Sequence, residues 1–152
     1  MSLPLEDALR QCALHVQRMR SAMQGIGFPL EAARLQSADD PLVARLDQFA
    51  FRYTKLQDTL GEHVLRQFCT EVLLEPLEDA ALSDVLAFLE RSGYMGAADW
   101  RAQRAARNAL THEYPEQVSW QVETLNLAYQ LAQQLIGWFE RLRTEFEKSK
   151  SA

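Results

Sequence analysis

Apolar side chains recur at intervals of three and four residues over nearly the whole chain. This spacing places them on one face of an α-helix. The first such run covers residues 5–23 and is broken by the glycines and the proline of residues 24–29. No strand pattern competes with the helical one, and no internal repeat is present. The pattern therefore predicts an all-helical protein.

A long helix is expected to follow the polar loop that ends near Pro41. Asp40 suits its N-cap and Pro41 its first helical position. Its apolar stripe continues to about Leu74, and Gly61 allows a kink on the way. The stripe predicts one face buried against the rest of the protein.

The remainder of the chain predicts further helices separated by short turns. They are expected over residues 77–91, from Trp100 to about Thr111 with Asp99 as cap, and from about residue 115 to residue 147. Ser92 and Gly93 stop the first of them. Residues 148–152 are expected to be a frayed tail. The sequence thus predicts one domain over residues 1–152, an antiparallel bundle of four to five helices.

Composition narrows the function classes. The chain has 152 residues and a formal net charge of −5, and its pI is about 5.2. This acidic charge argues against a general nucleic-acid binder, but it allows a small basic cleft. No apolar run is long enough to span a membrane, and the N-terminus does not resemble a secretory signal. Cys12 and Cys69 lack metal-ligand spacing, so a reduced, cytoplasmic setting is expected.

The segment from Arg107 to Pro115 holds the most specific chemistry. A guanidinium can hold a phosphate with a planar fork of donors, and an imidazole can move a proton near neutral pH. Arg107 and His112 are therefore sufficient parts for metal-free cleavage of a phosphodiester. Asn108 would orient either group or the phosphate. We expect no metal and no cofactor.

The helix that carries Arg107 is expected to separate a packing face from a basic face. At about 100° per residue, one face collects small side chains, which are Ala102, Ala105, Ala106, Ala109 and Leu110. The opposite arc carries Arg101, Arg104, Asn108 and Thr111, with Arg107 at its edge. Arg101 and Arg104 are candidates for contacts with an RNA backbone, or else solvated surface arginines.

Arg107 and His112 need a further condition to share one site. An unbroken helix would leave them roughly 140° apart. Either the helix ends before His112, which Pro115 favours, or the two side chains come from two copies of the chain in a two-fold dimer. A structural alternative also stands, because arginine and histidine near a helix C-terminus favour the helix dipole.

Several motifs together resemble one superfamily. They are the order Phe51 to Gly61 on a long helix, Trp100 seven residues before Arg107–Asn108, and His112–Glu113–Tyr114–Pro115. This set resembles the HEPN superfamily, and most closely its HepT-like toxins. The resemblance covers roughly Pro41 to the end of the chain, whereas the first forty residues match only as an amphipathic helix.

The resemblance implies a function and partners. In active members of the family, the arginine and histidine that correspond to Arg107 and His112 line a cleft at a homodimer interface and cut RNA without a metal. The family's polar residue falls on Asn108. A minimal nucleotidyltransferase (MNT) antitoxin is the usual partner, and in some pairs it adds AMP to the tyrosine that corresponds to Tyr114. We therefore expect a ribonuclease toxin of a HepT/MNT-type pair.

Two alternatives remain open on the sequence. The protein can be a catalytically silent HEPN module that docks a minimal nucleotidyltransferase or presents a substrate to it. It can also be a purely structural helical bundle. His15 and His63 are expected to have structural or surface roles, and Trp100 is expected in the core.

Overall fold

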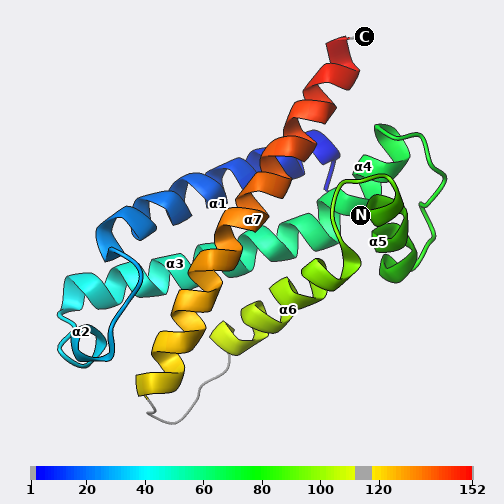
Figure 1. Cartoon of the computed structure of the whole chain (residues 1–152). Coiled ribbons are helices and arrows are strands. Elements are labelled where there is room, and N and C mark those ends of the chain that lie inside the picture. The colour runs from blue at the N-terminus through cyan, green and yellow to red at the C-terminus, as the bar shows by residue number, and fades with distance from the viewer. Residues whose placement is uncertain (1–2, 112–117, 152) are drawn as a thin grey trace.

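The computed structural model describes residues 3–111 and 118–151, and within them the chain is helical with no strand (Figure 1). The expected all-α class is therefore confirmed for the described residues. Within them, no helix has the length and apolar character needed to cross a membrane.

The helices follow one another with short connections. Their bounds are α1 Leu5–Ile26, α2 Ala32–Gln36, α3 Asp40–Thr59, the π-helical segment η1 Leu60–Val64, α4 Leu65–Glu71, α5 Leu82–Arg91, α6 Ala97–Thr111 and α7 Val118–Ser151. The long helix expected from Pro41 to about Leu74 is thus present as α3, η1 and α4 in unbroken succession.

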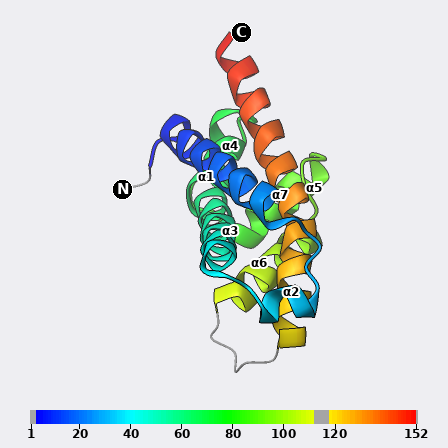
Figure 2. The ribbon, with the colours of Figure 1, turned by 90° about the vertical axis from the view of Figure 1, so that its left-hand side faces the viewer.

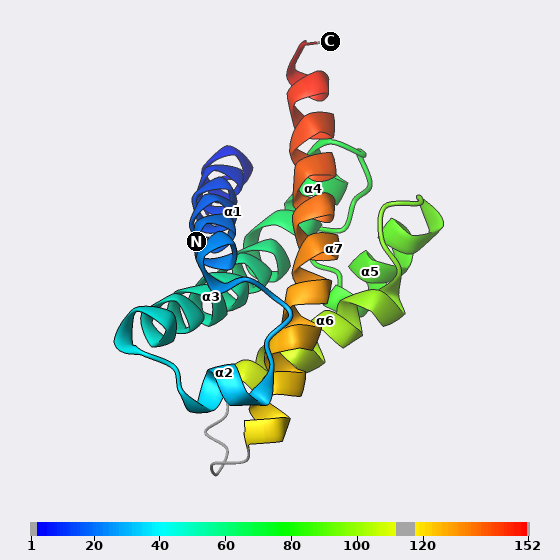
Figure 3. The same ribbon diagram turned by 60° about the vertical axis from the view of Figure 1, so that its left-hand side comes forward.

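Helix α1 packs antiparallel to the continuous helix formed by α3, η1 and α4. Arg45 of α3 donates to the carbonyl of Gly25 at one end of α1, and Gln67 of α4 donates to that of Leu3 at the other end. Helix α7 crosses the bundle diagonally (Figures 1 and 2). Helix α2 lies against the N-terminal half of α7 (Figure 3), beside which Leu30 and Asn126 exchange two hydrogen bonds.

The core lies where α1, α3 and α7 meet. The largest fully buried side chains include Phe49, Tyr53, Phe139 and Trp100. Phe49, Tyr53 and Phe139 come from apolar stripes that the sequence shows at helical spacing, whereas Trp100 comes from α6. Burial of these stripes, rather than intrinsic helix propensity, supplies most of the stability of such helices.

The helix starts differ from the expected ones for local reasons. Asp39, not Asp40, caps α3, because its side chain accepts a hydrogen bond from the Leu42 amide at 3.0 Å. Asp99 is not a cap either, since it lies inside the first turn of α6. Helix α5 begins at Leu82 instead of residue 77, after turns held by two hydrogen bonds from Arg66 to the Ala80 carbonyl.

The C-terminal tail is helical where fraying was expected. Helix α7 continues through Ser151. Lys150 forms an ion pair with Glu6 of α1 at 3.1 Å, and its ammonium lies 4.9 Å from the centre of the Phe146 ring. These contacts give the last turn partners that its polar sequence did not reveal.

The distortion allowed at Gly61 is the π-helical segment η1. A Cβ at Gly61 would lie 3.0 Å from Cζ2 of Trp100. Glycine therefore lets the indole of α6 approach the backbone of this helix closely. Asp58 lies two residues before the segment, so the local register of the helix sets where its carboxylate meets α6.

Candidate functional site

The expected site residues that the structure describes lie on α6, from Arg101 to Asn108. Arg101 and Asn108 are exposed. The side chains of Arg104 and Arg107 keep 43% and 24% of their exposure, so Arg107 is the more enclosed of the two. His112 and Tyr114 lie outside the described residues, so their roles stay predictions.

The buried face of α6 is only in part the one expected from its alanines, since Ala106 is buried and Leu110 packs against the core as expected. Trp100, Gln103 and Ala106 are buried, whereas Ala102 and Ala105 are exposed. The large indole of Trp100 decides the orientation, because it packs between Gly61 and the ring of Trp138, with the two indole centroids 6.2 Å apart. Burying one tryptophan removes more apolar surface from water than burying two alanines.

Asp58 of α3 holds Arg107 with a two-point ion pair. Nε of Arg107 donates to Oδ1 at 3.1 Å, and one terminal nitrogen donates to Oδ2 at 2.9 Å. A bidentate arginine–carboxylate pair fixes orientation as well as position. The guanidinium of Arg107 therefore has a defined place at the seam between α3 and α6.

Arg104 completes a cluster that carries a net positive charge. It donates to Oδ1 of Asp58 at 3.2 Å, one helical turn from Arg107. The two guanidinium groups and one carboxylate leave a formal charge of +1 in an otherwise acidic protein. Hydrogen bonding to Asp58 is the largest cause that raises the pKa of Arg107 above its ordinary value, so this charge is permanent.

Arg107 retains N–H groups for a ligand. A guanidinium has five N–H donors, and Asp58 occupies two of them. A third makes a long contact of 3.4 Å with the side-chain oxygen of Asn108. The edge of the guanidinium that points away from Asp58 can therefore hold a phosphoryl oxygen, with the Asn108 amide beside it.

A buried polar network supports the cluster from below. The Tyr53 hydroxyl donates to the side-chain oxygen of Gln103 at 2.6 Å, and the Gln103 amide donates to the Leu131 carbonyl at 2.8 Å and to Gln134 at 3.1 Å. Gln57 donates to the Gln103 carbonyl at 2.6 Å. This network joins α3, α6 and α7 directly beneath Asp58, and a fully bonded buried network specifies one arrangement.

These supporting residues were not singled out from the sequence. Asp58 lies within the motif from Phe51 to Gly61, but the motif assigns it no role. A usable signal existed for the two glutamines. Gln57 follows Tyr53 at four residues and Gln103 follows Trp100 at three, so both stand at core spacing.

A groove opens beside the C-terminal end of α6. Its volume is about 380 Å³, and α3, α6 and α7 each contribute to its walls. Ala109 and Leu110 of α6 face Ala50 of α3 and Leu125 of α7 across it. The cluster is thus followed, one turn further along α6, by a mixed apolar and polar hollow.

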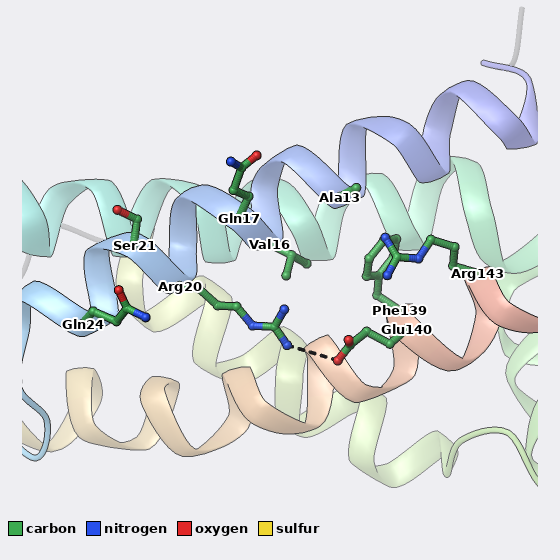
Figure 4. Close-up of a pocket in the computed structure, with 9 residues that line it drawn as sticks. All are labelled: Ala13, Val16, Gln17, Arg20, Ser21, Gln24, Phe139, Glu140 and Arg143. Carbon is green, nitrogen blue, oxygen red and sulfur yellow. Dashed lines mark hydrogen bonds and ion pairs between the residues drawn. The ribbon is translucent and has the colours of Figure 1, made fainter.

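A second hollow of about 300 Å³ lies between α1 and α7, away from the cluster (Figure 4). Arg20 forms an ion pair with Glu140 across it at 3.1 Å. Arg143 lies over the ring of Phe139, with 4.9 Å from its guanidinium carbon to the ring centroid. Both cations of this hollow therefore already have a partner, Glu140 for Arg20 and the Phe139 ring for Arg143. The described residues of this hollow form no buried hydrogen-bond network like the one beside Asp58.

Comparison with known proteins gives no relative. No protein-family model, no curated protein and no solved structure matches the chain. Within residues 3–111 and 118–151, no group of three His, Cys, Asp or Glu side chains is placed to hold a metal ion.

Proposed function

We propose that this protein is a metal-independent endoribonuclease of the HEPN type, the toxin of a HepT/MNT-type pair. One observation supports it most. Asp58 fixes the guanidinium of Arg107 at the last turns of α6, five residues before His112, and leaves N–H groups for a phosphate. A guanidinium oriented before the substrate arrives stabilises charge on phosphoryl oxygens without reorganisation.

The proposed reaction is an internal transesterification. His112 takes the proton of a ribose 2′-hydroxyl, and the 2′-oxygen attacks the adjacent phosphorus. Arg107 stabilises the charge that develops on the phosphoryl oxygens, while Asn108 orients the phosphate. The bond to the 5′-oxygen breaks, and that oxygen receives a proton from solvent or from His112 of a second copy. The products are a 2′,3′-cyclic phosphate and a free 5′-hydroxyl.

The partners follow from the same proposal. A homodimer brings two copies of the Arg107–His112 segment to one cleft. A minimal nucleotidyltransferase silences the protein by adding AMP to Tyr114, which puts a negative phosphate where the RNA phosphate would bind. Arg101 and Arg104 extend the positive charge along α6 toward the RNA backbone.

The first test is cleavage of total tRNA in the presence of EDTA. The wild type should cut and leave cyclic phosphate ends, whereas Arg107→Ala and His112→Ala should not. Arg10→Ala is the matched control, since Arg10 forms an exposed pair with Asp7 on α1. Single-stranded DNA should stay intact, because it lacks the 2′-hydroxyl. Cutting by His112→Ala at the wild-type rate would refute the proposed chemistry.

A second candidate is a silent module that docks a nucleotidyltransferase or presents a substrate to it. The ion pair with Asp58 favours it, because this contact also gives Arg107 a purely structural use. The protein would then cut no RNA while its intact mass shows Tyr114 unmodified. Addition of a minimal nucleotidyltransferase and ATP would raise the mass by AMP units, and Tyr114→Phe would prevent the increase.

A further inference from the structure

The exposed side of α3 continues beyond the Asp58 cluster. Phe51, Lys55 and Asp58 are spaced by four and three residues, so they share one side of the helix. Seven residues of α-helix separate Phe51 from Asp58 by about 10 Å along the axis. In the ribbon views α1 and α6 flank α3 (Figures 1 and 2). This side of α3 therefore borders both neighbours.

An exposed aromatic ring lies among cations on this side. Phe51 keeps 49% of its exposure. The guanidinium carbon of Arg52 lies 5.2 Å from the ring centroid, and the ammonium nitrogen of Lys55 lies 5.7 Å from it. Cation–π attraction holds these groups together at such distances. An aromatic surface bordered by two positive charges is thus open to a ligand.

The two cations are not neutralised by acids of the described residues. None of the ion pairs found within residues 3–111 and 118–151 includes Arg52 or Lys55. Arg20 in the α1–α7 hollow is different, because Glu140 pairs with it (Figure 4). Nε of Arg52 is buried and has no hydrogen-bond partner within the part of the chain that the structure describes. The positive charge beside Phe51 is therefore available to an anion.

His15 of α1 borders the same surface as a neutral group. A terminal nitrogen of Arg52 lies 3.0 Å from its Nδ1. Because arginine can only donate, Nδ1 must accept, and the ring proton is on Nε2. Burial is the first cause that lowers the pKa of His15, and the charges of Arg52 and Lys55 lower it further. His15 thus adds an N–H donor without another full charge.

We propose that Phe51, Arg52, Lys55 and His15 form a binding platform for the single-stranded RNA that the Arg107 cluster cuts. A base packs on the exposed ring of Phe51, and a neighbouring phosphate lies against Arg52 and Lys55. This α3 platform deepens the proposed function and rests on it for the identity of the substrate.

The charge distribution favours a nucleic-acid strand as the occupant. The whole chain carries −5, so a polyanion is repelled by most of the surface and is retained only where cations are concentrated. Aromatic rings with adjacent cations bind single strands of any sequence, because every base has a stacking face. The axial distance of about 10 Å to Asp58 lets one strand reach both the platform and Arg107.

Binding is measured apart from cleavage with a strand that cannot be cut. A fluorescein-labelled single-stranded DNA of mixed sequence lacks the 2′-hydroxyl, and its anisotropy reports binding alone. Phe51→Ala should weaken binding about fivefold or more, since one base–aromatic stack is lost. Lys55→Ala should weaken it as well and lower the slope of log affinity against log salt by about 0.7, as expected for one phosphate contact on a single strand.

The control variants separate local contacts from general charge. Arg143→Ala removes one positive charge in the α1–α7 hollow and should leave binding unchanged. Lys55→Arg should keep the salt slope, because the charge is kept. Melting temperatures of all variants should stay close to that of the wild type, since Phe51 and Lys55 are exposed. Equal weakening by Arg143→Ala would overturn the proposal, because general charge would then explain the binding.

Failure of the platform and failure of the ribonuclease proposal give different results. If Phe51→Ala and Lys55→Ala bind the DNA like the wild type, the platform is wrong, whether or not the protein cuts RNA. If they bind weakly while the wild type binds but cuts no RNA, the platform stands and the cleavage is wrong. If Phe51→Ala turns a dimer into a monomer in size-exclusion chromatography, the surface is a protein interface and the platform is refuted.

Discussion

Helix α3 packs against its two neighbours in two different ways. Against α1 it packs through apolar side chains, and Phe49 and Leu56 of α3 belong to the same buried core as Val16 and Met19 of α1. Toward α6 it presents Tyr53, Gln57 and Asp58, which meet Gln103 and the two arginines. An apolar seam stabilises the fold through burial. A polar seam instead fixes the orientation of its side chains, because hydrogen bonds determine where each group points.

The comparison explains why the candidate chemistry lies on one side of α3 only. A fully bonded polar seam adds little net stability, since its groups were also bonded to water in the unfolded chain. Its cost when a partner is lost is larger than its gain when complete. The α1–α3 seam can therefore carry the fold, and the α3–α6 seam can hold the guanidinium of Arg107 in one orientation.

The largest effect should come from breaking the apolar seam. Phe49→Ala removes a fully buried ring and should lower the free energy of unfolding by about 3–5 kcal/mol. Urea unfolding followed by circular dichroism measures it. Phe51→Ala is the matched control on the same helix, because its ring is half exposed, and it should cost about 1 kcal/mol or less. Equal costs for the two variants would contradict the assignment of the seam.

A smaller loss should follow from breaking the buried network. Gln103→Leu leaves the Tyr53 hydroxyl and the Leu131 carbonyl without their partner and should cost about 1–3 kcal/mol. Gln133→Leu, at an exposed position of α7, should cost far less.

A double variant tests whether the network acts as a unit. Adding Tyr53→Phe to Gln103→Leu removes both partners of one hydrogen bond and should recover part of the loss. A coupling energy of about 0.5 kcal/mol or more in this cycle is expected for groups in contact. Strictly additive losses would show that the bond between Tyr53 and Gln103 is not formed in solution.

Removing the carboxylate of Asp58 should cost little stability and much function. The pair with Arg107 is about one-quarter exposed, so Asp58→Asn should change the free energy of unfolding by about 1 kcal/mol or less. RNA cleavage should fall strongly, because the guanidinium loses its orientation. Glu71→Gln, at an exposed position of α4, is the control and should leave cleavage unchanged.

A second readout keeps this test informative in the absence of cleavage. The Nε–H proton of Arg107 donates to Asp58, and a hydrogen-bonded arginine proton exchanges slowly enough to be seen by NMR. Its signal should be present in the wild type and in Glu71→Gln, and it should be lost in Asp58→Asn. A signal that persists in Asp58→Asn would show that another group orients Arg107.

The two seams also differ in how far the sequence predicts them. The apolar stripe of α3 was predictable because Phe49, Leu56 and their neighbours recur at helical spacing. The polar seam was not, because Asp58 and Arg107 are 49 positions apart and meet only through the packing of two helices. The buried face of α6 was predicted only in part, because burial of the large Trp100 ring leaves Ala102 and Ala105 exposed.

The C-terminal end of α7 was predicted wrongly for a related reason. Lys150 looked like part of a frayed tail, yet its ion pair is with Glu6, at the opposite end of the sequence. The helical class and the motif from Arg107 to Pro115 were recognisable from the sequence, since both depend on local spacing. What the motif does stays a prediction, because His112 and Tyr114 lie outside the described residues.

The smallest effect on the free energy of unfolding should come from the polar contact between His15 of α1 and Arg52 of α3 at the edge of the apolar seam. Burial and the two nearby cations lower the pKa of His15 below its usual value of 6.5. The unfolded chain therefore binds a proton more readily than the folded one. This contribution to stability is complete above pH 6.5 and is lost as the pH falls through that value toward the lower folded pKa. Stability should thus decrease on acidification.

Comparing urea unfolding at about pH 7.5 and about pH 5.5 tests this dependence, because the two values lie on either side of the ordinary histidine pKa. His15→Gln cannot titrate and should lose less stability over the interval than the wild type. His63→Gln removes a histidine for which no contact with these cations exists among the described residues, so it should keep the wild-type difference. Equal losses of stability in the wild type and in His15→Gln would contradict the contact. They would mean that the His15 ring is hydrated and does not lie against Arg52.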